Sequence, residues 1–274
     1  MYTVQQFNEM GKELYDNLLL RFEPIAIKCL ESYDDIPEGC VQPSKTGEKI
    51  PALCQSFALV RRNRRALAIF PEDNWCVWPI VSLKQREVDE ETYNDLGCRF
   101  FLKDRNVSLD HFGKIFPRVE KPVAGLALAP LSTCTFEPDV IVIYCTPSQA
   151  RQFLMAAQFT TGEPVVAHFD IVGSCMQAIV PILNGEKDYH LAMPDDGEYE
   201  RSLCYEDEML FSVSKDKAQE MMDSFHALQS WGFGHKKLAY DMNFEFPRPD
   251  FYNNAMKKWG LKEGPLWGGK ERED

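Results

Sequence analysis

Residues 138–150 read Pro-Asp-Val-Ile-Val-Ile-Tyr-Cys-Thr-Pro-Ser-Gln-Ala, and this stretch carries the clearest signal for the fold. Val140 to Tyr144 is a short apolar run rich in β-branched residues, which is typical of a buried strand. Thr146-Pro147 matches a helix start, because a capping hydroxyl precedes a proline in the first turn. The pattern from Gln149 to Phe159 is helical. The stretch therefore predicts a strand followed directly by a helix.

The chain contains an approximate internal repeat. Residues 66–81 align without a gap with residues 165–180, so that Cys76 lies over Cys175. Two halves, residues 22–118 and 120–215, are therefore predicted to be pseudo-symmetric copies of one strand–helix unit. The alternative is that the two stretches only share a similar architecture, in which a cysteine fits after the turn as a small apolar residue.

These patterns predict an α/β fold, with α+β as the alternative. The duplicated core occupies residues 1–229, and an amphipathic N-terminal helix covers residues 4–22. Each half places a strand before a cysteine-bearing helix start, at 66–70 in the first half and 165–169 in the second. Residues 230–274 are rich in aromatic residues and are interrupted by prolines, which predicts an aromatic C-terminal strap.

Charge and hydropathy exclude several classes of protein. The 274 residues include 30 Lys and Arg against 42 Asp and Glu, giving a formal net charge of −12. That field repels polyphosphate backbones, so no nucleic acid partner is expected. No stretch approaches the roughly 18 apolar residues that a membrane span requires. We expect a cytoplasmic protein without a membrane partner.

The nine cysteines are spread along the chain. An odd number cannot form a complete disulfide framework, and no C-x-x-C pair occurs, so a metal site would have to be assembled by the fold. The repeat would bring Cys76 and Cys175 together about a pseudo-twofold axis. Each would lie at a helix N-terminus, where the amide dipoles favour the metal-binding thiolate.

Over about residues 10–225 the chain resembles the bacterial and archaeal domain-of-unknown-function family 169. The resemblance rests on the 138–150 stretch, the Gly173-Ser-Cys175 turn, Asp207 to Ser212, Glu23 to Lys28 and the Cys54-Gln55 pair. It implies three family cysteines, at Cys54, Cys76 and Cys175, but it implies no reaction. The chain departs from the family pattern at Cys145 and in the aromatic tail.

Three thiols from separate elements can hold a [4Fe–4S] cluster and leave one iron open. We therefore expect an iron–sulfur protein in anaerobic redox or lyase chemistry on a small-molecule substrate, with a redox partner in the reductase case. Cys145 would be a fourth ligand if the cluster instead serves electron transfer. The alternative is a cluster-free small-molecule-binding or interaction module, whose cysteines pack as small hydrophobic residues.

Two further expectations concern residues outside the cysteines. His168 lies in the expected strand 165–169, where it is either an acid–base group or a hydrogen-bonded core histidine. Trp231, Phe233 and His235 are expected to line a substrate pocket beneath the tail, because glycines flank them. The tail's alternative roles are core covering and a homodimer contact.

Overall fold

The structure is a computed structural model that describes residues 2–96, 102–233 and 248–266. The chain divides into two compact units, Met1–Phe225 and His226–Asp274. The sequence predicts this boundary between residues 229 and 230. Each unit is described by itself below.

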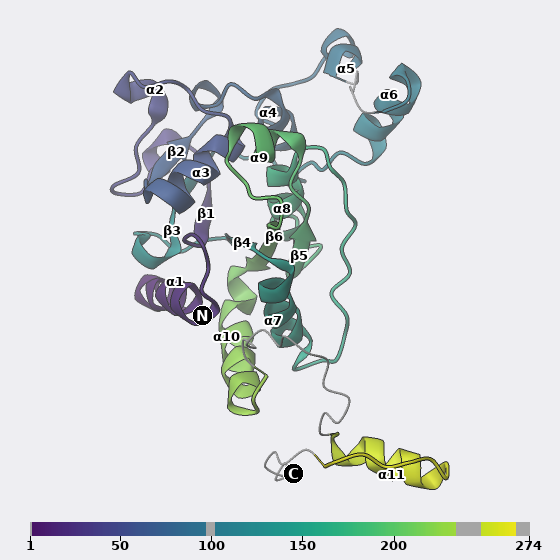
Figure 1. The fold of residues 1–274 in the computed structure, drawn as a ribbon. Coiled ribbons are helices and arrows are strands. Elements are labelled where there is room, and N and C mark those ends of the chain that lie inside the picture. The colour runs from purple at the N-terminus through teal and green to yellow at the C-terminus, as the bar shows by residue number, and fades with distance from the viewer. Residues whose placement is uncertain (1, 97–101, 234–247, 267–274) are drawn as a thin grey trace. The chain divides into compact units, whose positions relative to one another are not determined.

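In the described part of the chain, six strands form one antiparallel sheet in the order β2-β3-β1-β4-β6-β5 (Figure 1). The strands are β1 (Ile25–Leu30), β2 (Leu67–Ile69), β3 (Gly125–Pro130), β4 (Val140–Cys145), β5 (Tyr189–Ala192) and β6 (Met209–Ser214). The helices are α1 (Val4–Leu18), α2 (Pro43–Thr46), α3 (Leu53–Asn63), α4 (Val77–Ser82), α5 (Glu90–Leu96), α6 (Arg105–Lys114), α7 (Pro147–Gln158), α8 (Ser174–Leu183), α9 (Asp196–Arg201), α10 (Lys215–Ser230) and α11 (Asp250–Lys258). The expected mixed helix–sheet class is confirmed, and the antiparallel pairing is the arrangement that its α+β alternative describes.

The 138–150 stretch forms the expected strand and helix. β4 is fully buried between β1 and β6. Thr146 caps α7 reciprocally with Gln149, because each side chain accepts a hydrogen bond from the other residue's backbone N–H. The Gln149 side-chain amide also donates to the backbone oxygen of Leu18 at 2.9 Å. The cap therefore starts α7 and ties it to the end of α1.

Successive residues of β4 face two different layers of helices, one on each side of the sheet. Val142 and Tyr144 belong to the core cluster that contains residues of α3 and α8. On the opposite face, Phe153 of α7 stacks on Phe211 of β6, with ring centroids 4.8 Å apart. Because successive strand residues point to opposite faces, Tyr144 faces α8 while Cys145 faces the α7 layer.

The expected strand at residues 165–169 is wrong. These residues run as an extended segment without ladder pairing, and Phe169 is 57% exposed. β5 forms the edge of the sheet beside β6, and this segment does not pair with it. Asp170 anchors its end by accepting a hydrogen bond from Gln177 of α8 and pairing with His111 of α6. The internal repeat stays a prediction.

The second unit contains α11 and a returning segment. Asn253 exchanges two hydrogen bonds with the backbone of Gly264, at 2.9 and 3.1 Å. Arg248 donates its backbone N–H to the oxygen of Pro265 at 2.7 Å. These contacts hold α11 and the segment that follows it together within residues 248–266. That the tail acts as a strap stays a prediction.

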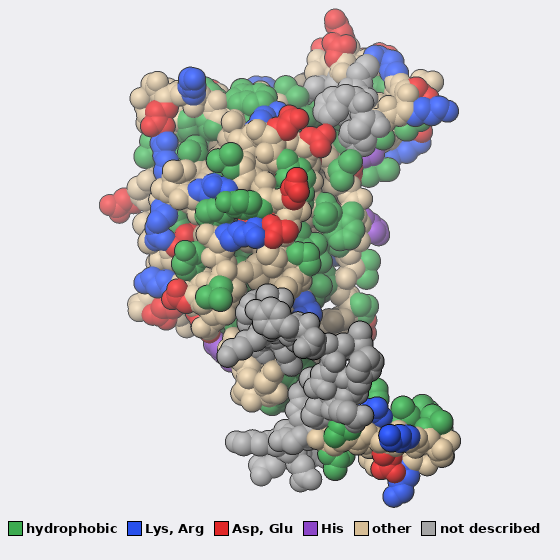
Figure 2. Space-filling view, viewed as in Figure 1, with side chains coloured by type: hydrophobic (Ala, Val, Ile, Leu, Met, Phe, Trp, Pro, Cys, Tyr) green, Lys and Arg blue, Asp and Glu red, His purple; other side chains and the backbone are tan. Residues whose placement is uncertain are grey.

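Charged side chains of both signs are interspersed over the face of the first unit that Figure 2 shows. Some form surface ion pairs, such as Arg65 with Glu48 at 2.7 Å. Among the helices that the structure describes, none is both long and apolar enough to cross a bilayer.

The close approach of α1 to the segment after β3 generates a stability prediction. A Cβ atom on Gly11 would lie 2.6 Å from the backbone nitrogen of Ser132. Gly11→Ala should therefore lower the free energy of unfolding by about 1–2 kcal/mol, because overpacking outweighs the gain in helix propensity. Urea denaturation measures the change. Lys12→Ala, at an exposed position of the same helix, is the control, and equal stability of the two variants would contradict this packing.

Candidate functional site

Three of the predicted site cysteines lie at the starts of three different helices. Cys54 is the second residue of α3, and Cys175 is the second residue of α8. Cys76 is the residue that caps α4. Each therefore lies where the first N–H groups of a helix lack intrahelical partners.

The structure brings these three thiols into one region. Negative charge on Cys54 and on Cys76 raises the pKa of Cys175, so both thiols lie within electrostatic reach of the third. The packing of α4 against α8 and of α3 against α9 produces this proximity. Cys54 and Cys76 are 22 positions apart in the sequence, and Cys175 is 99 positions beyond Cys76. Local spacing therefore could not have revealed the group.

Burial controls the chemistry of these thiols. Cys54 and Cys175 are 6% and 7% exposed, and Cys76 is half-buried. Burial raises the pKa of Cys54 to about 12 and that of Cys175 well above its ordinary value. The sequence-based expectation that helix dipoles favour the thiolate is therefore outweighed by desolvation. Without a metal the thiols are protonated near neutral pH, which disfavours a role as free nucleophiles.

Asp195 joins the starts of two helices at this site. One of its carboxylate oxygens accepts the backbone N–H of Ser174, the first residue of α8, at 3.1 Å. The other accepts the backbone N–H of Glu198 in α9, at 2.9 Å. Both oxygens therefore have a partner, and the bridge holds Cys175 near α9.

Glu198 is the second acidic residue of the group, and it is fully buried. Tyr144 donates its hydroxyl to Oε1 of Glu198 at 2.9 Å. Oε2 has no hydrogen-bond partner among the residues that the structure describes. Burial, followed by repulsion from Asp195, raises the pKa of Glu198 to about 8. Its charge in turn raises the pKa of Cys54 and Cys175.

Two arginines provide the positive charge around these groups. Arg201 lowers the pKa of Cys54, Cys76 and Glu198 against the larger effect of burial. Arg61 is 1% exposed, and its guanidinium lies 4.0 Å from the centroid of the Tyr144 ring. It donates to Oε2 of Glu208 at 3.3 Å and thereby neutralises a second buried carboxylate.

Sequence reasoning missed the contribution of α9. The pattern Asp195-Asp-Gly-Glu198 fits a capped helix start, and that signal could have identified α9. Nothing in it indicates that Glu198 is buried, because carboxylates usually cap helices at the surface.

Cys145 is buried on the opposite face of the sheet from these thiols. Burial raises the pKa of its thiol, and the charge of Glu208 raises it further. The structure therefore does not bring Cys145 together with Cys54, Cys76 and Cys175.

The remaining predicted residues lie elsewhere. His168 is exposed on the extended segment, and its charge acts on His190 of β5. Trp231 is 46% exposed and Phe233 is half-buried, while His235 lies outside the described residues. That these tail residues line a pocket stays a prediction.

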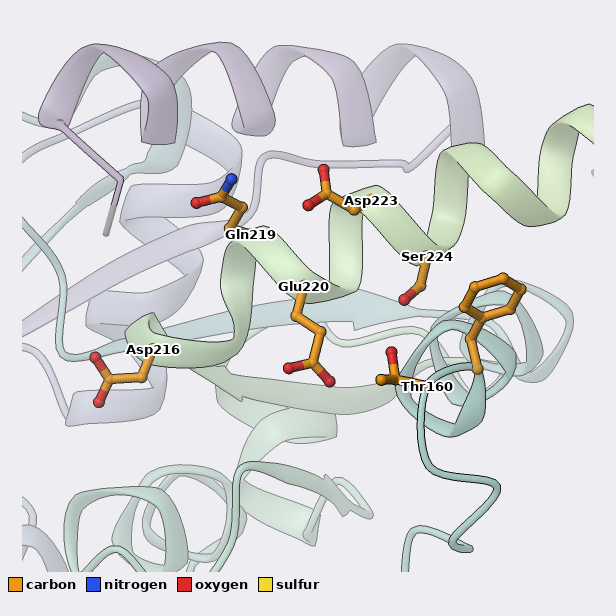
Figure 3. Close-up of a pocket in the computed structure, with 7 residues that line it drawn as sticks. Thr160, Asp216, Gln219, Glu220, Asp223 and Ser224 are labelled. Atoms are coloured by element: carbon orange, nitrogen blue, oxygen red, sulfur yellow. The ribbon is translucent and has the colours of Figure 1, made fainter.

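A surface hollow lies between α7 and α10, in the layer opposite the cysteines (Figure 3). Glu220 and Ser224 point toward Thr160 in this view, whereas Asp223 points the other way. Its other lining residues are Phe159, Asp216 and Gln219. The hollow contains none of the predicted site residues.

Within residues 2–96, 102–233 and 248–266, no group of three or more His, Cys, Asp or Glu side chains is arranged to hold a single metal ion. This finding includes the thiols of Cys54, Cys76 and Cys175.

Residues 13–224 match the family DUF169, described as "Uncharacterised ArCR", and the chain belongs to this family. It is similar to an uncharacterised protein, MJ0308, from Methanocaldococcus jannaschii. The two are 22% identical over 239 residues, which cover 85% of this chain and 99% of the archaeal protein. No solved structure matches the chain. The matched residues end close to the boundary between the two units.

The buried carboxyl group of Glu198 generates a pH prediction for the iron-free protein. Its folded pKa of about 8 exceeds its ordinary value of 4.5, so folding favours the protonated form. The resulting stability is complete below about pH 4.5 and is lost as the pH rises through about 8. Glu198→Gln should flatten the decline in the free energy of unfolding across this range.

The measurement is urea denaturation at several pH values. Glu200→Gln, at an exposed position of the same helix, is the matched control and should retain the wild-type profile. A Glu198→Gln profile parallel to that of the wild type would contradict the raised pKa.

Proposed function

We propose that this protein binds a [4Fe–4S] cluster through Cys54, Cys76 and Cys175, and that it acts in anaerobic redox or lyase chemistry on a small molecule. One observation carries the proposal: Cys54 and Cys76, which lie at two other helix starts, are both within electrostatic reach of the buried Cys175. Cysteine thiolates are the usual ligands of such clusters, and three of them leave one iron open.

The chemistry of the donor set fits a cluster better than a single ion. A single ion needs its ligands gathered within one coordination sphere. In a cubane each thiolate binds a different iron, so its ligands are spaced more widely. Three sulfur donors also favour iron–sulfur chemistry over the oxygen-preferring cations.

The surrounding residues can sustain the charge of bound thiolates. The dipoles of α3 and α8 place partial positive charge at the helix starts that carry Cys54 and Cys175. Arg201 adds a full positive charge within reach of Cys54 and Cys76. Because free thiols here are protonated, binding must release their protons.

A bound cluster would supply electron transfer, or Lewis acidity at its open iron. Cys145 lies on the other face of the sheet, which supports three protein thiolates and thus Lewis acidity over pure electron transfer. The proposal places the protein in the cytoplasm, where thiols remain reduced, and the cysteines that the structure describes are all free. Its partner is a small-molecule substrate, together with an electron donor if the reaction is a reduction.

The second candidate is a cluster-free binding or interaction module. The observation in its favour is that burial keeps Cys54 and Cys175 neutral, as expected for cysteines that pack as small hydrophobic residues.

Protein purified without oxygen should be brown and should contain iron and sulfide. Cys54→Ser, Cys76→Ser and Cys175→Ser should each lose most of the bound iron and the visible absorption, since each removes a thiolate. Cys145→Ser is the matched control, because Cys145 is equally buried but lies on the opposite face. Colourless, iron-free wild-type protein after anaerobic reconstitution would favour the second candidate.

A further inference from the structure

The hollow between α7 and α10 has the size of a small-molecule site. Its volume is about 480 Å³, which lies within the range of ligand pockets. α10 supplies most of the lining side chains, and Phe159 and Thr160, which follow α7, supply the rest. The hollow lies on the opposite side of the sheet from the cysteines. What it binds therefore does not depend on the proposed cluster.

The lining side chains of α10 include a row along one side of the helix. Asp216, Glu220 and Ser224 follow one another at intervals of four positions, so each lies about one helical turn from the next. Glu220 and Ser224 point toward Thr160 (Figure 3). Carboxylates four positions apart on a helix repel each other. A cation bound between Asp216 and Glu220 would relieve this repulsion.

Ser224 presents a buried hydroxyl group to the hollow. The residue is only 3% exposed, and its hydroxyl makes no hydrogen bond within the part of the chain that the structure describes. Hydroxyl groups in helices commonly bond to a carbonyl of the preceding turn. Ser230 of the same helix does so, donating to the oxygen of Ala227 at 2.7 Å. Ser224 instead points toward Thr160 across the hollow, where a bound ligand would give it a partner.

A second hydroxyl group without a partner lies in the same layer. The Tyr189 ring of β5 packs on Phe211 with centroids 6.2 Å apart, and Phe211 stacks on Phe153 of α7. The Tyr189 oxygen is buried and has no hydrogen-bond partner among the described residues. Burial and then the charge of Glu220 raise the pKa of Tyr189, so the two side chains are near each other. Unpartnered hydroxyl groups thus accompany Glu220.

The charge at the hollow favours a positively charged ligand. Asp216, Glu220 and Asp223 line it, although Asp223 points the other way in Figure 3. Lys217 donates to Oε2 of Glu220 at 2.7 Å, which leaves Oε1 for another donor. Both side chains of this pair are about a third exposed, so water screens their attraction. The net charge of −12 also draws cations toward the chain.

The arrangement suits an organic cation better than a metal ion. Among the residues that the structure describes, there is no group of three or more His, Cys, Asp or Glu that could hold a metal ion. The carboxylates of Asp216 and Glu220 start from Cβ atoms roughly 6 Å apart. Two ammonium groups joined by a short aliphatic chain match this spacing. Phe159 and Thr160 supply an apolar surface and a hydroxyl oxygen beside it.

We propose that the hollow between α7 and α10 binds an aliphatic diamine or polyamine. One ammonium group donates to Oε1 of Glu220 and to the hydroxyl oxygen of Ser224. A second ammonium group pairs with Asp216, while the Phe159 ring contacts the methylene chain. The hollow is thus a second binding site, separate from the cysteines in position and in chemistry.

The test is isothermal titration of the full-length protein with putrescine and with spermidine at low ionic strength. The wild type should bind each amine at a single site. Glu220→Gln should weaken binding roughly tenfold, because it removes a charge-assisted hydrogen bond. Ser224→Ala should weaken it severalfold by removing one acceptor. Lys217→Ala should tighten it, since both oxygens of Glu220 then become available.

Glu200→Gln is the matched control, because it changes the net charge equally at an exposed position of α9. It should retain the wild-type affinity. Equal weakening in Glu200→Gln and Glu220→Gln would overturn the proposal, since it would show attraction to the overall charge alone. Wild-type affinity in Ser224→Ala and in Glu220→Gln would overturn it as well. Magnesium chloride that displaces the amines at equal concentration, or a wild type that binds neither amine, would also contradict an amine site.

Discussion

The bridge that Asp195 makes between the starts of α8 and α9 is the contact on which the arrangement of the site depends. Its two oxygens accept N–H groups from residues 21 and 3 positions away along the chain. One carboxylate therefore caps the starts of two helices at once. The same contact fixes the positions of Cys175 and Glu198 relative to each other. The hydrogen bonds by which Asp195 caps α8 and α9 therefore also assemble the site.

Desolvation and helix dipoles compete at the cysteines, and desolvation prevails. A helix N-terminus contributes roughly half an elementary charge, whose effect on a nearby group is commonly under about 2 kcal/mol. Complete burial of an ionised group costs several kcal/mol. The thiols accordingly remain neutral until a cation is present to pair with them. Neutral buried thiols of this kind react slowly with oxidants.

The sequence predicts the parts of this fold that are encoded locally. The Val140 to Tyr144 strand, the Thr146 cap and the helix after it all follow from residues within a few positions of one another. The 165–169 segment also has a largely apolar pattern, yet it forms no strand, because strand formation requires pairing with segments distant in the sequence. The hydrophobic periodicity of a segment shows that it can form a strand. It does not show whether the segment pairs with a strand of the sheet.

The candidate site likewise has parts that the sequence predicts and parts that depend on contacts between distant segments. The cysteines were recognisable from the repeat and from the family resemblance, whereas Glu198 was not. Its role depends on burial, and burial depends on α9 packing against α3, a contact between residues far apart in the sequence. Cys145 is the opposite case, because the sequence suggested it as a ligand and the structure places it away from the site. Its residue type suits a ligand, but a strand displays alternate residues on opposite faces, so its neighbour Tyr144 reaches the site instead.

The network behind Tyr144 explains how a buried carboxylate can be kept at the site at all. Arg61 lies between the Tyr144 ring and Glu208, so its charge reaches two acidic groups from one position. Its second guanidinium nitrogen donates to the backbone oxygen of Ser202 at the end of α9. Arg61 thus offsets the charge of Glu198 and also helps to position α9. Because a buried pair that loses one partner is strongly destabilised, the fold can retain this arrangement only as a whole.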